Sequence, residues 1–290
     1  MREWKWQYAE LTDRVLDNKF VIVIPCYNAE ETIRLAVLSA LIQEFDNLAI
    51  IIRNDMSTDK TGDIVKDVFG INPGEGDFYI KNEERDIIYI ENKKKFYGGG
   101  NTYDSVMRFV NDPYAIVGVV DGDDYLYTTH AAKVIYEAYQ ELPERWLIWS
   151  QHASKEQDKR GYAGYSRRLP ADEVIYSSRK YWGVSHFRTC LAGLFHLLDP
   201  ADLADPNDSD SYAKICGDAA LLYPIIEMCG NARSLFINQI LYYYNDGIPS
   251  NDFQVYRSEI EDYRAYFEDK EPYKQLGPDH VFEIPVNQLK

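Results

Sequence analysis

Cysteine is scarce in this sequence, and its spacing fits neither a metal nor a redox motif. The 290 residues include only Cys26, Cys190, Cys216 and Cys229, with no CxxC pair. Most of them lie in apolar stretches. This pattern argues against a disulfide framework and against a zinc site, and we expect buried free thiols.

Long apolar runs and excess positive charge are also missing. No apolar run approaches the roughly 20 residues that span a bilayer, and the first residues lack a secretory apolar region. The 31 Lys and Arg residues are outnumbered by 47 Asp and Glu residues, giving a net charge of −16. These absences argue against stable membrane insertion and against broad nucleic-acid binding. We therefore expect a cytoplasmic protein.

What the sequence does contain is typical of a large globular chain. Hydrophobic residues make up 46% and charged residues 27%, and the length is enough to bury a sizeable core. We expect one domain over residues 1–290. The 24 tyrosines offer flat apolar faces with a polar edge, which suit sugar or base contacts as well as ordinary packing.

Buried strand patterns alternate with helical patterns through the first 140 residues. The strand patterns lie at residues 20–24, 48–52, 87–90 and 115–120. Such alternation predicts an α/β fold, with right-handed crossovers and a mainly parallel sheet covered by helices on both faces. In the second half, strands are expected near 146–149 and 235–245, and a helix over 219–228.

Three carboxylates follow the strand pattern at 115–120. Asp121, Asp123 and Asp124 lie within four residues, at the strand end where ligands bind in open α/β sheets. Because three neighbouring acids repel one another, a hard divalent cation such as Mg²⁺ or Mn²⁺ is their natural partner. A solvated acidic turn is the alternative.

Three other loops are expected at the same sheet edge. Residues 25–28 bring a flat aromatic, residues 54–59 a carboxylate, and residues 92–100 three lysines and three glycines. We predict a flexible loop through residue 100, and Asn28 as the cap of the first helix. Together these are the parts of a site for a nucleoside diphosphate and its cation.

The motifs at residues 24–30, 54–61 and 120–124, in this order and spacing, resemble the family 2 glycosyltransferases of the GT-A fold. The resemblance covers roughly residues 20–245. It implies a nucleotide-diphosphate sugar donor, with UDP-sugars favoured, a divalent cation (Mn²⁺ or Mg²⁺), and inversion at the anomeric carbon. The acceptor would be a glycan or another hydroxyl compound.

The resemblance also implies roles for residues of the donor loops. Tyr27 lies against the base and Asp55 hydrogen-bonds it, with Pro25 and Asn28 in the same donor-binding loop. Lys95 adds positive charge near the diphosphate. A loop-packing role for Tyr27, and a solvated charged face for the lysine, are the alternatives.

The acidic motif matches the family's DxD pattern. The resemblance places Asp121 near the ribose or sugar and on the metal, and Asp123 on the metal. Asp124 is expected to orient this site by contacting it from behind.

An inverting transfer also needs a base for the acceptor hydroxyl. The family places it in an acid-acid motif that opens a late helix, and residues 216–221 resemble that element. Asp218 is therefore the predicted catalytic base, although Gly217 replaces the first acid and Asp218 also suits a helix N-cap.

An aromatic and polar stretch precedes that motif. His186, Trp182 and Arg188 are candidates to bind acceptor or diphosphate, and packing is the alternative for His186. We assign residues 20–125 to donor binding, 126–245 to the acceptor side and 250–290 to a helical tail.

Two other functions stay open at this point. One is a sugar-phosphate nucleotidyltransferase, which needs a basic loop for the triphosphate, and residues 25–31 contain no Gly, Lys or Arg. The other is a non-catalytic nucleotide-sugar-binding module, against which the retained Asp121, Asp123 and Asp218 argue.

Overall fold

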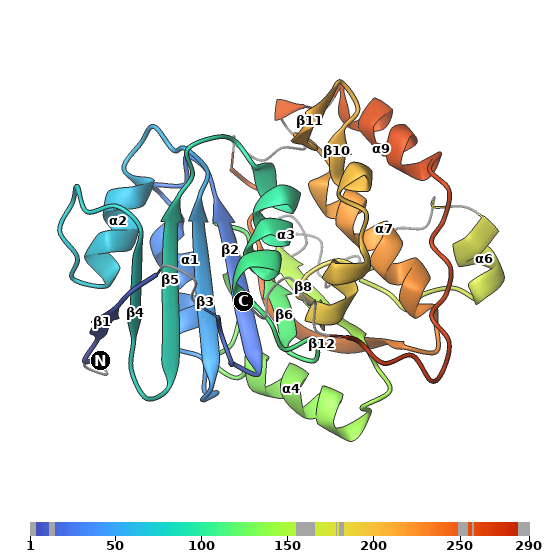
Figure 1. Cartoon of the computed structure of the whole chain (residues 1–290), viewed down its shortest axis with the longest axis horizontal. Helices are drawn as coiled ribbons and strands as arrows, with labels where there is room; N and C mark the ends of the chain where they lie inside the picture. Colours follow the sequence, from blue (N-terminus) through green and yellow to red (C-terminus); the bar gives the residue numbers. More distant parts are fainter. Residues whose placement is uncertain are drawn as a thin grey trace.

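The computed structural model (Figure 1) describes residues 4–11, 15–154, 166–177, 179, 183–248, 255–256 and 258–283. In this part of the chain a ten-stranded sheet has the order β1-β4-β5-β3-β2-β6-β9-β8-β12-β7. Its strands are β1 (Gln7–Ala9), β2 (Phe20–Cys26), β3 (Leu48–Asn54), β4 (Phe78–Lys81), β5 (Arg85–Glu91), β6 (Ile116–Val119), β7 (Tyr125–Leu126), β8 (Leu147–Ser154), β9 (Arg188–Leu191) and β12 (Ser234–Tyr244). A separate hairpin pairs β10 (Ala204–Asp205) with β11 (Asp208–Tyr212).

Helices flank this sheet, and several connect its strands. They are α1 (Ile33–Leu41), α2 (Thr61–Val68), α3 (Tyr97–Phe109), α4 (Ala131–Glu141), α6 (Asp172–Ser177), α7 (Gly217–Cys229) and α9 (Ile260–Glu268), with 3₁₀ turns η1 (Ala192–Leu197) and η2 (Pro200–Leu203). No helix in the described ranges combines the length and the apolar character that a bilayer span requires.

The centre of the sheet confirms the α/β prediction. Strands β5, β3, β2 and β6 pair in parallel, and every residue of β2 and β3 is buried because both faces are covered. Strands expected near 146–149 and 235–245 are β8 and β12, and α7 is the predicted late helix.

Strand β9 joins the two halves of the sheet in a way that strand-helix alternation does not predict. It lies between β6 and β8 and runs antiparallel to both. The first residue of β9, Arg188, therefore lies beside the strand that leads into the acidic motif.

Helices α3 and α7 lie against each other with their first turns in contact (Figure 1). A Cβ atom on Gly99 would lie 2.5 Å from the Gly217 carbonyl oxygen. Only glycines allow the two backbones to come this close. Both helices therefore begin near the sheet edge where the parallel strands end.

After β12 the chain passes through α9, and residues 271–283 continue without a further helix or strand. Phe282 is buried and packs against Trp146 with 4.9 Å between ring centroids. A Cβ on Gly193 would lie 2.5 Å from the Phe282 ring. The end of the described chain thus packs under the second half of the sheet.

Candidate functional site

A cleft of about 900 Å³ lies at the carboxyl edge of the parallel strands. One wall, here called the donor-side wall, consists of the loops after β2, β3 and β6 and the start of α3. The other, here called the α7 wall, consists of β9, the start of α7, residues that follow β12, and α9. The cleft brings together the predicted residues Pro25, Tyr27, Asn28, Asp55, Lys95, Asp121, Asp123, His186, Arg188 and Asp218.

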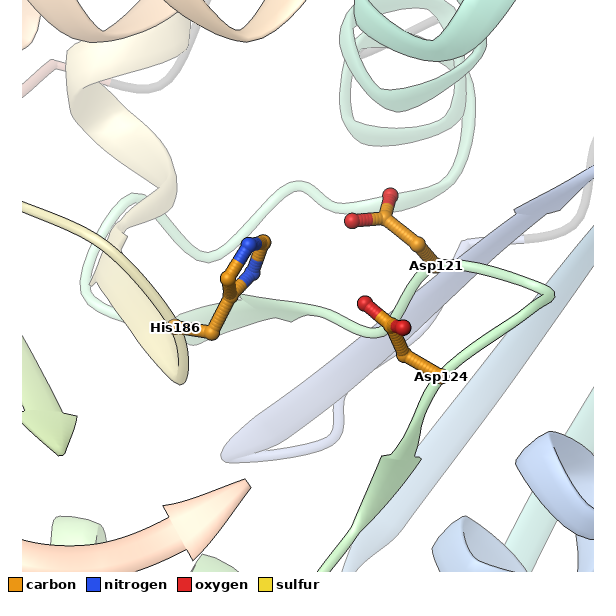
Figure 2. Close-up of side chains that lie close together, drawn as sticks. All are labelled: Asp121, Asp124 and His186. Atoms are coloured by element: carbon orange, nitrogen blue, oxygen red, sulfur yellow. The ribbon is translucent and has the colours of Figure 1, made fainter. Parts of the chain in front are cut away.

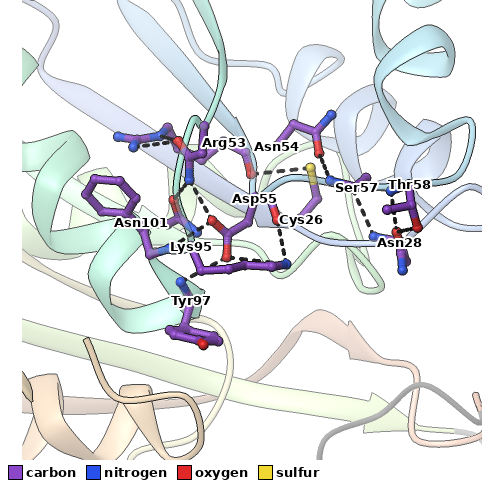
Figure 3. Close-up of polar contacts among 12 residues, drawn as sticks. Cys26, Asn28, Arg53, Asn54, Asp55, Ser57, Thr58, Lys95, Tyr97 and Asn101 are labelled. Carbon is purple, nitrogen blue, oxygen red and sulfur yellow. Dashed lines mark hydrogen bonds and ion pairs between the residues drawn. The ribbon is translucent and has the colours of Figure 1, made fainter. Parts of the chain in front are cut away.

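Asn28 links two loops of the donor-side wall (Figure 3). Its backbone N–H donates to Ser57 Oγ at 2.9 Å, and its side-chain Oδ1 accepts from the Thr58 N–H at 2.8 Å. Helix α1 begins only at Ile33, after Thr32 at the N-cap position, so the predicted helix cap at Asn28 is wrong. The side chain instead satisfies a donor of the neighbouring loop.

Asp55 organises the beginning of α3. Its buried carboxylate accepts hydrogen bonds from Asn92 Nδ2 at 2.7 Å and from the N–H groups of Phe96 and Tyr97 at 2.9 Å each (Figure 3). A helix start leaves such N–H groups unpaired, and a carboxylate satisfies them. The helix therefore begins at Tyr97, and the predicted flexible loop through residues 98–100 is wrong.

Tyr27 presents a half-exposed ring to the cleft, with Lys95 over it. The Lys95 Nζ lies 3.0 Å from the ring centroid and donates to the Asp55 carbonyl oxygen at 2.6 Å. Burial lowers the pKa of Lys95, and the nearby Asp55 carboxylate opposes that shift. Pro25 lies at the end of β2, where its carbonyl accepts from the Gly122 N–H at 3.0 Å.

Asp124 anchors the acidic motif to β12. It is 1% exposed and accepts hydrogen bonds from the Tyr242 hydroxyl at 2.8 Å and the Asn245 N–H at 2.7 Å. Burial, together with the charges of Asp123 and Asp121, raises the pKa of Asp124 well above its ordinary value. The anchored loop presents Asp121 and Asp123 to the cleft.

A candidate metal-binding group combines Asp121 and Asp124 with His186 (Figure 2). One ligand atom from each lies within 4.8 Å of the others. Burial lowers the pKa of His186 well below its ordinary value, so the ring is neutral. Its buried Nδ1 has no hydrogen-bond partner among the described residues. Carboxylate oxygens and a neutral imidazole fit a divalent cation such as Mn²⁺.

The position of His186 depends on stacking. Its ring packs on Tyr242 and Tyr244, with centroid distances of 4.7 and 5.0 Å and ring planes 13° apart in both cases. The sequence reasoning assigned His186 to acceptor or diphosphate and did not place it with the acidic motif. No local pattern signals this, because β9 and β12 bring the residues together from distant parts of the chain.

Arg188 connects the two walls of the cleft. Its buried guanidinium places Nη1 at 3.2 Å from Asp218 Oδ2 and Nη2 at 3.6 Å from Asp121 Oδ2. The predicted base and the first acid of the DxD pattern therefore share one cation.

Asp218 lies in the first turn of α7, with its side chain 42% exposed. The N-cap position belongs to Cys216, so Asp218 is not the N-cap residue. Gly217 stands where the resemblance predicts an acid, and a Cβ atom there would lie 2.9 Å from the Gly99 backbone nitrogen. The close contact between α7 and α3 therefore favours glycine at this position.

Other residues of the cleft were not singled out from the sequence. Lys214, Tyr244, Tyr256 and Arg264 line the α7 wall, and they carry no motif that marks them. Trp182, a predicted acceptor or diphosphate contact, lies outside the described residues.

The sequence model of the family described as "Glycosyl transferase family 2" matches residues 21–196. The chain belongs to this family. The matched range includes Asp121, Asp123 and Arg188.

Two curated relatives match parts of the chain. One is the UDP-Glc:alpha-D-GlcNAc-diphosphoundecaprenol beta-1,3-glucosyltransferase WfaP of Escherichia coli, 31% identical over 115 residues, which are 40% of this chain and 39% of WfaP. The other is the glycosyltransferase GlyA of Streptococcus pneumoniae, 27% identical over 112 residues, which are 39% of this chain and 14% of GlyA. The matches therefore span well under half the length of either relative.

Solved structures share the fold at low identity. TarS 1-349 of S. aureus has a TM-score of 0.53 at 16% identity, over 87% of this chain and 66% of that one. Glucosyl-3-phosphoglycerate synthase of Mycobacterium tuberculosis, in complex with Mn²⁺, UDP and glucosyl-3-phosphoglycerate, has a TM-score of 0.52 at 14% identity, over 87% of this chain and 80% of that one. Mannosyltransferase PcManGT of Pyrobaculum calidifontis, in complex with GDP-Man and Mn²⁺, has a TM-score of 0.51 at 12% identity, over 93% of this chain and 70% of that one. These likenesses confirm the GT-A fold.

Proposed function

We propose that this glycosyltransferase moves a sugar from a UDP-sugar to an acceptor hydroxyl, with inversion and with the help of a divalent cation. The observation that carries the proposal is the shared guanidinium of Arg188. Its two terminal nitrogens contact Asp121, predicted to bind the donor, and Asp218, the predicted base. A donor beside Asp121 therefore has a carboxylate across the cleft from it.

Features of the donor-side wall support nucleotide binding. The exposed face of Tyr27 is a surface on which a base stacks, and Lys95 and Asp55 lie beside it. UDP-Glc is the donor in the name of WfaP, and UDP is present in the TarS and glucosyl-3-phosphoglycerate synthase complexes. These relatives favour a uridine nucleotide, whereas PcManGT is a complex with GDP-Man.

In the proposed reaction, the Asp218 carboxylate takes the proton of the acceptor hydroxyl. The hydroxyl oxygen forms a bond to the anomeric carbon from the face opposite the diphosphate. The bond from that carbon to the diphosphate oxygen breaks, and its electron pair leaves with the diphosphate. Arg188 lies beside both carboxylates, and its positive charge stabilises the negative charge that builds up on the leaving group.

Asp121, Asp124 and His186 would hold the cation, and the earlier assignment of Asp123 as a ligand stays a prediction. Such an ion neutralises charge on the departing diphosphate when it is bound. The protein residues keep their own tasks: Asp124 fixes the loop to β12, and the stacked tyrosines orient the ring of His186.

We further propose that residues 20–125 bind the donor and residues 126–245 shape the acceptor site. The family match favours this function over a nucleotidyltransferase and over a non-catalytic module. A cytoplasmic location stays a prediction.

The proposal is tested by calorimetric titration with UDP, GDP, CDP and dTDP, each with and without Mn²⁺. We expect Mn²⁺-dependent binding of UDP, followed by release of UDP when the matching UDP-sugar and an acceptor are supplied. Absence of binding to all four nucleotides would contradict the proposed function.

Variants in the same titration separate the two possible metal-ligand sets. His186→Gln should lose the Mn²⁺ dependence if the ring binds the ion, and Asp123→Asn should lose it if the DxD carboxylate does. Asp112→Asn is the control, because Asp112 pairs with Lys19 at the surface and does not line the cleft.

A further inference from the structure

Two basic side chains line the α7 wall of the cleft without a role in the reaction described above. Lys214 is half-buried and lies two residues before Cys216, which is the N-cap residue of α7. Its Nζ lies 4.3 Å from the ring centroid of Tyr256. Arg264, on α9, lines the same cleft. The α7 wall therefore has two cations besides Arg188.

These two cations differ in ion pairing from the other basic side chains of the cleft. Arg188 is paired with Asp121 and Asp218, and Lys95 lies near Asp55. Lys214 and Arg264 form no ion pair with any of the residues that the structure describes.

A shortage of acidic residues does not explain why Lys214 and Arg264 lack ion pairs. In a chain with a net charge of −16, carboxylates outnumber basic groups and are the commonest charged neighbours. Lys214 is half-buried, and a partly desolvated cation with no counter-ion is costly. Arg264 is exposed and adds a second positive charge without an ion pair at the same cleft. The two side chains together favour an anionic ligand.

The backbone around Lys214 is held firmly. Its N–H donates to Asp205 Oδ2 at 2.9 Å, and the Tyr263 hydroxyl donates to the same oxygen at 2.8 Å. Asp205 is 8% exposed. The carboxylate thus binds the main chain of Lys214, while the ammonium group lies over Tyr256.

Apolar side chains continue the same wall beyond the two cations. They come from α7, from α9 and from the chain before α9: Leu221, Leu222, Ile225, Val255 and Ile260. A wall that is cationic and then apolar suits a ligand with an anionic group and an apolar or sugar-ring body.

We propose that the acceptor carries a phosphate or diphosphate ester, and that Lys214 and Arg264 bind this anion. A phosphate is favoured because a guanidinium matches its oxygens in pairs and an ammonium adds a point charge. The inference rests on the proposed transferase function. A soluble sugar phosphate and a lipid-linked sugar phosphate share this chemistry.

The test is calorimetric binding to the full chain saturated with UDP and Mn²⁺, so that the donor site is filled. The probes are glucose 1-phosphate and geranyl phosphate, each with a neutral partner, methyl glucoside and geraniol. We expect both phosphates, or one of them, to bind more tightly than their neutral partners. Glucose 1-phosphate alone would indicate a soluble acceptor, and geranyl phosphate alone a lipid-linked one.

Variants locate the anion. Lys214→Met and Arg264→Gln should each weaken phosphate binding about tenfold, because hydrogen bonds to charged groups are strong. Lys133→Met is the control, because Lys133 is exposed on α4, pairs with Glu137 and does not line the cleft. Salt should weaken binding to the wild-type chain and have less effect on the double variant.

Three results would overturn the inference. They are no phosphate binding by a chain that binds UDP, equal binding of neutral and charged probes, and phosphate binding that neither Lys214→Met nor Arg264→Gln weakens. A chain that fails to bind UDP in the first titration would instead contradict the proposed function, so the two failures are distinguishable.

Discussion

The two walls of the cleft are built in different ways. On the donor-side wall, each functional loop follows a strand of the parallel sheet, and β2 and β3 are buried at every residue. On the α7 wall, the functional residues come from β9, α7 and α9, which are distant in the sequence. The first wall depends on backbone pairing between neighbouring strands. In the second, β9 is paired in the same sheet, whereas α7 and α9 are positioned by packing between helices.

A buried ion pair shows how the α7 wall is held. Arg179 Nε lies 2.5 Å from Glu227 Oε1, and its Nη2 lies 2.7 Å from Glu227 Oε2. The same guanidinium donates from Nη1 to the Phe267 carbonyl at 2.9 Å. It therefore joins α7 to α9. Helix α7 is also buried along most of its length, but this ion pair concentrates a part of the wall's stability in two side chains. Substitution of one of them should therefore have a large effect.

The largest expected effect is on the transfer rate and follows from a change at Asp218 on the α7 wall. Asp218→Asn should lower the transfer rate about a thousandfold, because a general base contributes about 10²–10⁴ in rate. Mn²⁺-dependent UDP binding should stay close to that of the wild type. Initial rates and calorimetry measure both. Normal turnover of the variant would mean that Asp218 is not the base.

The next effect tests whether the α7 wall depends on its buried ion pair. Arg179→Met leaves Glu227 buried without its partner and should lower the free energy of unfolding by about 3–5 kcal/mol. Urea unfolding measures the change. The control is Arg34→Met, which breaks the exposed pair with Asp67 and should cost at most about 1 kcal/mol. Similar losses in the two variants would mean that the buried pair holds the α7 wall no more strongly than an exposed pair elsewhere in the chain.

A third prediction concerns pH and His152, which lies beside His186. Burial lowers the pKa of His152 from 6.5 to about 4, although Asp246 opposes the shift. The unfolded chain therefore binds a proton that the folded chain excludes, and stability falls as the pH drops from about 6.5 to about 4. The loss from this group amounts to roughly 3 kcal/mol.

Urea unfolding at several pH values checks this prediction. His152→Gln should make the dependence between pH 6.5 and 4 less steep, while His186 keeps its own contribution. His130→Gln, at an exposed position at the start of α4, should leave the dependence as it is. An unchanged slope in His152→Gln would contradict the prediction.

The smallest expected effect lies on the donor-side wall. Tyr27→Ala should weaken UDP binding about tenfold, because stacking of a base on an aromatic ring contributes about 1–3 kcal/mol. The free energy of unfolding should change little, since the ring is half-exposed. Tyr27→Phe keeps the ring and should bind UDP like the wild type. Equal affinity in all three proteins would exclude stacking on this residue.

The start of α3 shows why some elements escape prediction. The glycines at 98–100 are typical of a loop, yet they form the first turn of α3 because the Asp55 carboxylate binds the N–H groups of Phe96 and Tyr97. The cap comes from the residue that follows β3, about 40 residues earlier. A local pattern carries no information on such a partner.

The parallel strands β2, β3, β5 and β6, and the placing of Asp121 at the cleft, follow from local patterns. An apolar run marks each of these strands, and parallel strands end at one edge, so the residues after them must gather there. The position of His186 and Arg188 beside the acidic residues follows from no such rule. It depends on β9, which runs antiparallel between β6 and β8 and brings the imidazole and the guanidinium to the acids. Strand pairing across long separations is set by the packing of the whole sheet, and no single segment encodes it.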